Sequence, residues 1–389
     1  MARRNRPVRE QVDFARNRIK HVLTTPLSAV AESLGRCLEE GVCSHRAGKL
    51  PADKLVELCS YVLYVADRLP QKYGERFFFD AAMIRAMAKD WGGSLALSSM
   101  VIPLYGRTWG HGSLMMPSEN HEDAHLIDVI VFPGDDRLEA VDLLDYPWMA
   151  HELGHYVLFR DDSSFKNVFM PALDKRLRSL KLSAIADRGA ARVKAEAIIN
   201  ELRKLWTPSP DQRNWAHELA IDIIAVWTCG PAYLGSFKDQ IERPQTNPYE
   251  ITQNHPPYEV RLCALVDASR NLGFSDHAEG LSAIAGGWAK SNLRRGKNNK
   301  FLALADRGLI HECTQAAFRF CESLNLTKWT SSKLDVARAQ LLNEANLDLG
   351  VDLLLSARVI FEERGESALD EWERITVRQI AENVMRLSR

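Results

Sequence analysis

The sequence predicts a mainly α-helical protein with a small β-sheet, an α+β fold. Two observations lead to this class. Most of the 389 residues read as helical segments, and in the clearest of them apolar residues recur at three- and four-residue spacing, the period of an amphipathic helix. Only two segments have the short length and apolar composition typical of strands, and both are bounded by Gly, Pro and polar clusters.

Residues 8–90 are expected to be helical. The clearest segment begins at Pro51-Ala52-Asp53 and stops at Pro70. Its apolar positions follow helical spacing: Leu55, Leu58, Val62, Val65 and Leu69.

The two predicted strands follow a Gly92-Gly93 break. They are Leu95–Leu104 and Leu126–Phe132, and a polar loop from Tyr105 to Ala124 is expected between them.

Helices resume near Leu138. Asp145 is a candidate N-cap and Pro147 a first-turn residue for a helix over Trp148–Phe159. A long helical stretch, Phe165–Trp206, comes next. Asp211 is expected to cap a further helix, Trp215–Thr228, which stops at Gly230-Pro231.

Residues 240–257 contain four prolines and predict a loop. From Tyr258 onward the chain looks helical, apart from a basic loop over Lys290–Lys300. We therefore predict three parts: an N-terminal helical region (1–92), a core (93–289) and a C-terminal helical region (290–389).

Composition excludes several classes of protein. The formal net charge is −1, with 46% hydrophobic and 26% charged residues, which is globular and gives no reason to expect nucleic acid as a partner. Seven cysteines without a C-x-x-C pair, and no signal peptide, predict a cytoplasmic location. The longest apolar stretch, Leu219–Gly235, contains Asp222 and predicts a buried helix, so no membrane partner is expected.

The residues that carry chemistry are His151-Glu152-Leu153-Gly154-His155, an H-E-x-x-H motif on a predicted helix. Residues four apart differ by about 40° around a helix, so both imidazoles face one metal ion, expected to be Zn²⁺. Glu152 lies about 100° from His151, where it can take a proton from a metal-bound water.

A catalytic zinc site needs a third protein ligand. The candidate is Glu218, four residues before Asp222 on an otherwise apolar helix. Two carboxylates on a buried helix are costly unless paired or metal-bound. We therefore expect Glu218 to bind zinc and Asp222 to accept a hydrogen bond from a ligating histidine. A salt bridge of this pair with a nearby Arg or Lys is the alternative.

The other histidines are weaker candidates. His217 lies about 100° from Glu218 around the helix and is expected on its more polar side. His111, His121 and His125 lie in or beside the predicted polar loop and are expected to be solvated.

The pattern His151-Glu152-x-x-His155 followed by Glu218-x-x-x-Asp222 resembles the gluzincin class of zinc metallopeptidases. His255-Pro256 with Arg261 resembles a segment of the membrane heat-shock protease and CAAX prenyl-endopeptidase family, without that family's membrane spans. The resemblance covers residues 145–265. It implies a zincin-like core, and a role for His255 in stabilising the oxyanion, with Tyr258, Tyr233 and Arg261 as lesser candidates.

The expected activity is peptidase action on a peptide or a cytoplasmic protein, with Glu152 as general base and zinc and His255 stabilising the oxyanion. We expect the strand Leu126–Phe132 to be the sheet edge that pairs with an extended substrate.

Two alternatives remain open. The first is a regulatory protein that contacts nucleic acid or a partner through its basic N-terminal stretch and Lys290–Lys300. The second is a zinc hydrolase of a non-peptide amide, since the same ligand set serves both reactions.

Overall fold

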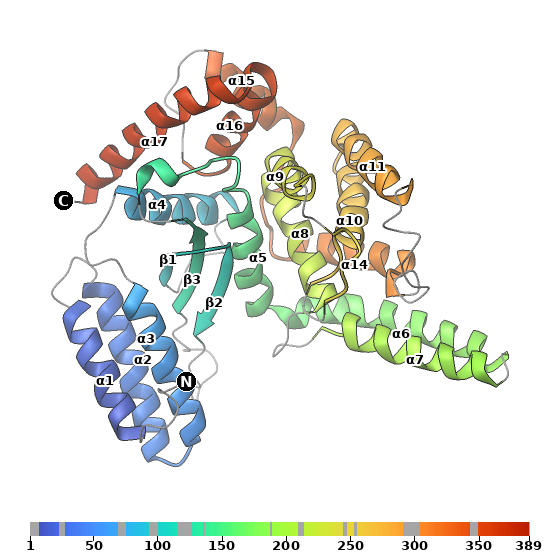
Figure 1. Cartoon of the computed structure of the whole chain (residues 1–389), viewed down its shortest axis with the longest axis horizontal. Helices are drawn as coiled ribbons and strands as arrows, with labels where there is room; N and C mark the ends of the chain where they lie inside the picture. Colours follow the sequence, from blue (N-terminus) through green and yellow to red (C-terminus); the bar gives the residue numbers. More distant parts are fainter. Residues whose placement is uncertain are drawn as a thin grey trace. The chain divides into compact units, whose positions relative to one another are not determined.

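The computed structural model describes residues 8–22, 28–68, 75–92, 100–114, 127–134, 137–186, 189–208, 214–243, 247–252, 255–290, 304–342 and 349–388. These residues are mainly helical with one small β-sheet, so the predicted fold class is confirmed (Figure 1). The chain divides into two compact units. Unit 1 comprises Met1–Arg85, Ala96–Val141 and Trp372–Arg389, and unit 2 comprises Ala86–Leu95 and Asp142–Glu371. The predicted boundaries at residues 92 and 289 stay a prediction.

Unit 1 begins with three helices, α1 (Val8–Val22), α2 (Ser28–Arg46) and α3 (Ala52–Arg68). They pack on one another through apolar residues at helical spacing, as the sequence predicts. The buried positions of α3 include four of the five expected ones: Leu55, Leu58, Val62 and Val65. Leu104 and Val129 of the sheet complete the same apolar core.

The sheet of unit 1 has three strands, β1 (Met100–Gly106), β2 (Gly110–Leu114) and β3 (Ile127–Pro133). Their order is β1-β3-β2, with β3 parallel to β1 and antiparallel to β2. The register aligns Leu104 with Val131, and Gly112 with Val129.

Two predictions about the sheet are wrong. The stretch from Tyr105 to Ala124 is not loop throughout, because it contains β2. The strand expected to be an edge, Leu126–Phe132, corresponds to β3, whose backbone is hydrogen-bonded on both sides. A central strand has no unpaired side for a substrate. A short 3₁₀ helix, η2 (Leu138–Ala140), follows.

Unit 2 is helical. Two further helices, α4 (Glu75–Asp90) and α17 (Glu366–Ser388), contribute residues to both units. The remaining helices are α5 (Trp148–Arg160), α6 (Asp162–Ala186), α7 (Ala190–Trp206), α8 (Trp215–Cys229), α9 (Pro231–Ile241), α10 (Tyr258–Asn271), α11 (Ser275–Lys290), α14 (Arg307–Ser323), α15 (Ser331–Leu342) and α16 (Val351–Arg364).

Helix α8 forms the centre of unit 2. It packs against α5, α9, α10 and α14, and every residue of it except His217 is buried. Helix α8 ends at Gly230, where φ is +54°, and α9 begins at Pro231. The prediction that the apolar stretch near Leu219 is a buried helix is therefore confirmed. Among the described helices, none is both long and apolar enough to cross a membrane.

The capping predictions differ from the structure. The N-cap of α5 is Pro147, and it is the backbone carbonyl of Asp145, not its carboxylate, that accepts the N–H of Trp148. The N-cap of α8 is Asn214, whose Oδ1 accepts the N–H of His217 at 3.1 Å. Asp211 lies outside the described residues.

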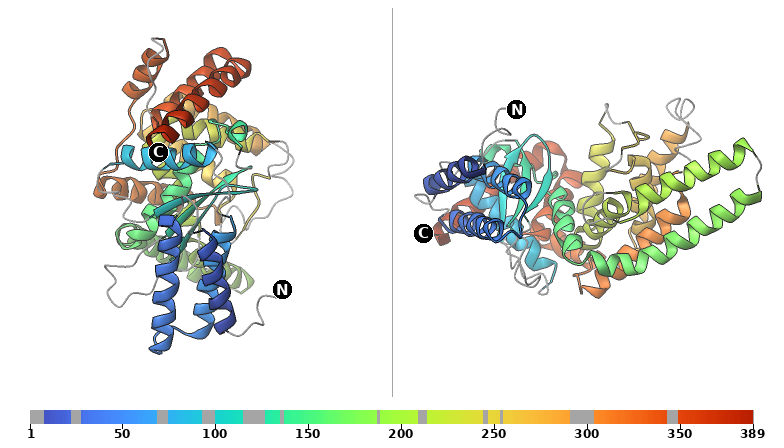
Figure 2. Two further views of the ribbon diagram at one scale, coloured as in Figure 1. Left: turned by 90° about the vertical axis from the view of Figure 1, so that its left-hand side faces the viewer. Right: turned by 90° about the horizontal axis from the view of Figure 1, so that it is seen from below.

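The predicted stretch Phe165–Trp206 is two helices, α6 and α7, which form an antiparallel hairpin (Figures 1 and 2). The chain reverses at Gly189, whose φ of +60° disfavours any residue with a side chain. Helical periodicity continues on both sides of this glycine, which is why the sequence pattern does not show the break.

The basic segments have few described residues. Of the predicted loop Lys290–Lys300, residues 291–300 lie outside the described part of the chain. In the N-terminal stretch, Arg16 is paired with Glu39 at 2.6 Å.

Candidate metal centre

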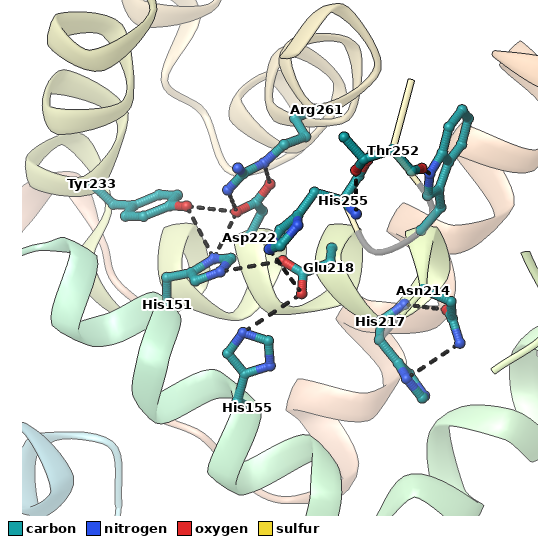
Figure 3. Close-up of polar contacts among 11 residues, drawn as sticks. His151, His155, Asn214, His217, Glu218, Asp222, Tyr233, Thr252, His255 and Arg261 are labelled. Carbon is teal, nitrogen blue, oxygen red and sulfur yellow. Dashed lines mark hydrogen bonds and ion pairs between the residues drawn. The ribbon is translucent and has the colours of Figure 1, made fainter. Parts of the chain in front are cut away.

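Three side chains from two helices form the candidate metal centre. His151 and His155 project from α5 and Glu218 from α8, and one ligand atom of each lies within 4.8 Å of the other two (Figure 3). Glu218 Oε2 is 3.4 Å from His151 Nε2, and Glu218 Oε1 is 3.7 Å from His155 Nε2. This is the one such group of metal-binding side chains among the described residues.

These distances fit a single small cation. Ligand atoms about 2.0–2.2 Å from a tetrahedral zinc ion are about 3.3–3.6 Å from one another. The observed separations of 3.4 and 3.7 Å are close to this range and longer than a good hydrogen bond. The donor set of two imidazoles and one carboxylate is one that zinc accepts.

Glu218 gives an independent reason to expect a cation. Its side chain is 0% exposed, and neither carboxylate oxygen has a hydrogen-bond partner among the described residues. A buried carboxylate without hydrogen bonds is expensive unless a positive charge compensates it. Burial raises the pKa of Glu218, but the neighbouring His151 outweighs this effect and lowers it. A lowered pKa favours the ionised carboxylate, which is the form that binds a metal.

Asp222 orients one of the histidines. It lies one turn after Glu218 on α8, and its Oδ1 is 2.9 Å from His151 Nδ1. A proton on Nδ1 leaves Nε2 as the free ligand atom, directed toward Glu218. Burial raises the pKa of Asp222, but the Arg261 guanidinium holds it well below its usual range. Asp222 is thus an ionised acceptor, which agrees with the tautomer required.

Two of the lesser oxyanion candidates are engaged elsewhere. The Tyr233 hydroxyl donates to Asp222 Oδ1 at 2.6 Å, and Arg261 donates to both Asp222 oxygens at 2.7 Å. Both residues are buried, on the Nδ1 side of His151 (Figure 3). The third, Tyr258, has its hydroxyl 3.5 Å from Gln240 Nε2. Tyr233 and Arg261 therefore face away from the position that a substrate oxygen would take.

His255 remains at the edge of the site. Its Nε2 is 3.9 Å from Glu218 Oε1, and its side chain is 50% exposed. Thr252 holds the backbone here: its hydroxyl accepts the N–H of His255 at 3.0 Å and donates to the His255 carbonyl at 2.8 Å. Trp215 Nε1 donates to the Thr252 carbonyl, which ties this loop to the start of α8. Sequence reasoning missed Thr252, although a threonine three residues before His255 is typical of such a turn.

Glu152 is buried on α5, directly after His151. The helix places it about 100° from His151, beside the ligands rather than among them. Its assignment as general base stays a prediction.

His217 does not join the site. Its backbone N–H donates to the Asn214 cap, and its Nδ1 is 3.5 Å from Asn214 Nδ2, away from Glu218 (Figure 3). The structure therefore brings Glu218, and not His217, to the two histidines. His111 lies in β2, and His121 and His125 lie outside the described residues.

Comparisons of the chain with protein-family models, with curated proteins and with solved structures found no match. The resemblance to gluzincins is therefore carried by the motif residues alone and stays a prediction.

Proposed function

We propose that this protein is a zinc-dependent peptidase whose metal is held by His151, His155 and Glu218. The observation that carries the proposal is the meeting of two imidazoles with a buried carboxylate that has no hydrogen bond among the described residues. Such a cluster is suited to a cation, and two of its members belong to an H-E-x-x-H helix that also supplies a glutamate.

His151, His155 and Glu218 would hold the zinc ion, which would supply Lewis-acid chemistry and lower the pKa of a water molecule toward neutrality. Glu152 takes the proton from the attacking water on its carboxylate and delivers it to the leaving amine. His255, the most exposed of the surrounding groups, donates from its ring to the oxygen on which negative charge develops. Asp222 keeps the proton of His151 on Nδ1 throughout.

The glutamate favours catalysis over a purely structural metal site. A structural site closes all four positions with protein ligands and needs no general base. His151, His155 and Glu218 would hold the metal as a group of three ligands, the number that a catalytic zinc site takes from the protein. We infer a peptide or protein substrate, as the gluzincin resemblance implies, and a cytoplasmic location, since all seven cysteines are free.

The proposal is tested with Glu152→Gln. The variant should bind one equivalent of zinc, measured by elemental analysis, and should no longer cleave a pool of proteome-derived peptides analysed by mass spectrometry. Glu259→Gln is the matched control, because Glu259 is also a buried glutamate but is paired with Arg307 instead of lying near the ligands. If Glu152→Gln cleaves as well as the wild type, or if the wild type binds no zinc, the proposal is wrong.

A further inference from the structure

Asp222 is the acceptor for three different side chains. Its Oδ1 lies 2.9 Å from His151 Nδ1, 2.6 Å from the Tyr233 hydroxyl and 2.7 Å from Arg261 Nη2, and its Oδ2 lies 2.7 Å from Arg261 Nε. All four residues are buried. One carboxylate therefore links a metal ligand to two residues that lie further from the metal centre (Figure 3).

Arg261 sets the plane of this carboxylate. Its Nε and Nη2 contact one oxygen each, the parallel two-bond arrangement that only a guanidinium can make. With both oxygens held, the Asp222 carboxylate cannot rotate about its terminal bond. The direction in which Oδ1 accepts from His151 is then determined as well.

Aromatic rings fix Arg261 in turn. Its guanidinium carbon lies 5.4 Å from the ring centre of Trp148, 5.3 Å from that of Phe237 and 5.7 Å from that of Tyr258. Planar guanidinium groups stack on such rings, whereas an ammonium group is a compact, strongly hydrated charge. A lysine at this position would restore the charge but neither the two bonds nor the stacking.

Tyr233 acts at the junction between the carboxylate and the imidazole. Its hydroxyl lies 2.6 Å from Asp222 Oδ1 and 3.4 Å from His151 Nδ1. The Trp148 ring contacts the rings of both Tyr233 and His151 edge-on, at 5.5 and 5.7 Å between centroids. Removing the hydroxyl alone leaves this packing in place.

We propose that Arg261 and Tyr233 are positioning residues that fix the orientation of the His151 ring through Asp222, and thereby determine how tightly the centre holds its metal. The inference rests on the metal site of the proposed function. Neither residue touches the metal or a substrate. They act only through the carboxylate that orients the ligand.

The chain offers a matched control for Arg261. Arg358 is also a buried arginine, is paired with Asp239 at 2.7 Å and lies 5.5 Å from the Phe361 ring centre, but neither partner contacts a metal ligand. A substitution there changes packing and charge burial to a similar extent. If the Arg261 substitution lowers zinc affinity and the Arg358 substitution does not, the loss therefore acts through the metal ligand His151.

The experiment compares zinc affinity, by competition with a chromogenic chelator, in the full-length wild type, Tyr233→Phe, Arg261→Lys and Arg358→Lys. Mutating the partner of a metal ligand typically weakens metal binding about 10- to 100-fold. We expect a loss in this range for Arg261→Lys, a smaller loss of about threefold to tenfold for Tyr233→Phe, and no change for Arg358→Lys. The visible spectrum of the cobalt-substituted protein should shift in the first two variants only.

A second measurement separates a positioning role from a general loss of stability. If Arg261 acts through the carboxylate, Arg261→Lys should weaken zinc binding less in an Asp222→Asn background than in the wild type. Equal effects in the two backgrounds would overturn the inference. So would wild-type affinity in Tyr233→Phe, which keeps the ring and serves as the deciding variant if Arg261→Lys fails to fold. A wild-type protein that binds no zinc refutes the proposed function itself, whereas unchanged affinity in variants of a zinc-binding wild type refutes only this inference.

Discussion

Gly154 of α5 lies directly against Ile221 of α8. A Cβ atom at position 154 would come within 2.9 Å of Ile221 Cγ2 and 3.5 Å of the Ile221 carbonyl oxygen. Gly154 stands between the two predicted histidine ligands, and Ile221 between the two carboxylates of α8. The close approach of these two residues is what brings the two halves of the metal centre together.

Gly154→Ala should therefore damage both the fold and the site. The methyl group meets a β-branched side chain that has little freedom to move, so the two helices must separate. We expect the free energy of unfolding to fall by about 1–3 kcal/mol, measured in urea, and zinc affinity to fall with it. Gly280→Ala is the control: Gly280 is also helical but has open space around its Cβ position, so this change should be neutral or stabilising. If Gly154→Ala is as stable as the wild type, this contact does not set the distance between α5 and α8.

Glu218→Gln should weaken zinc binding strongly while leaving the metal-free protein folded. The substitution removes a buried carboxylate whose oxygens have no hydrogen bonds among the described residues, but it also removes that carboxylate's favourable interaction with His151, so the two effects on the metal-free chain oppose one another. Zinc at 100 times its dissociation constant should raise the stability of the wild type by about 2.7 kcal/mol, and that of Glu218→Gln by far less. Thermal unfolding with and without zinc measures both effects. His217→Ala, one residue away and outside the cluster, should keep the zinc response; a variant that loses it would place His217 in the site.

Asn214→Ala should destabilise the helix that carries Glu218. The Asn214 side chain accepts the N–H of His217 at 3.1 Å and donates to the Thr207 carbonyl at 3.0 Å. Loss of an N-cap typically costs about 1 kcal/mol, and the carbonyl loses its donor as well. Asn214→Ser keeps a capping oxygen without placing a carboxylate against the Thr207 carbonyl, so it should recover the capping part of the loss in chemical denaturation. If the serine is as unstable as the alanine, the cap is not the reason.

Ionisation of Asp90 should lower the stability of the folded protein as the pH rises. Its Oδ2 accepts the N–H of Val351 at the start of α16, at 3.0 Å, while burial raises the pKa of this carboxyl above its usual value. A raised folded-state pKa means that stability is fully present below about pH 3.9, the unfolded value, and is lost as pH rises through the folded value. Asp90→Asn keeps an acceptor oxygen and does not titrate. Its stability relative to the wild type should therefore increase as pH rises above about 4. A constant difference across this range would contradict the assignment.

The sequence predicts most where a feature depends only on residues close together in the chain. The spacing of His151 and His155 predicts two imidazoles on one helix face, and the spacing of Glu218 and Asp222 does the same for two carboxylates, because helical geometry is independent of the rest of the fold. The fold class and most helices follow from apolar periodicity for the same reason. Local patterns do not decide which of several residues caps a helix, as at Asp145. They also do not decide whether a polar stretch forms a strand, as at β2.

Which residues surround the ligands is decided only by tertiary structure. The resemblance makes Tyr233 and Arg261 lesser candidates for contact with a substrate oxygen, but with α9 and α10 packed against α8 both side chains bond to Asp222. The central position of β3 likewise depends on β2, whose sequence has no strand pattern. The sequence by itself therefore determined which side chains share a helix face and hence the predicted metal chemistry. The tertiary structure decided which faces meet, because contacts between helices depend on burial and close packing across segments distant in the chain.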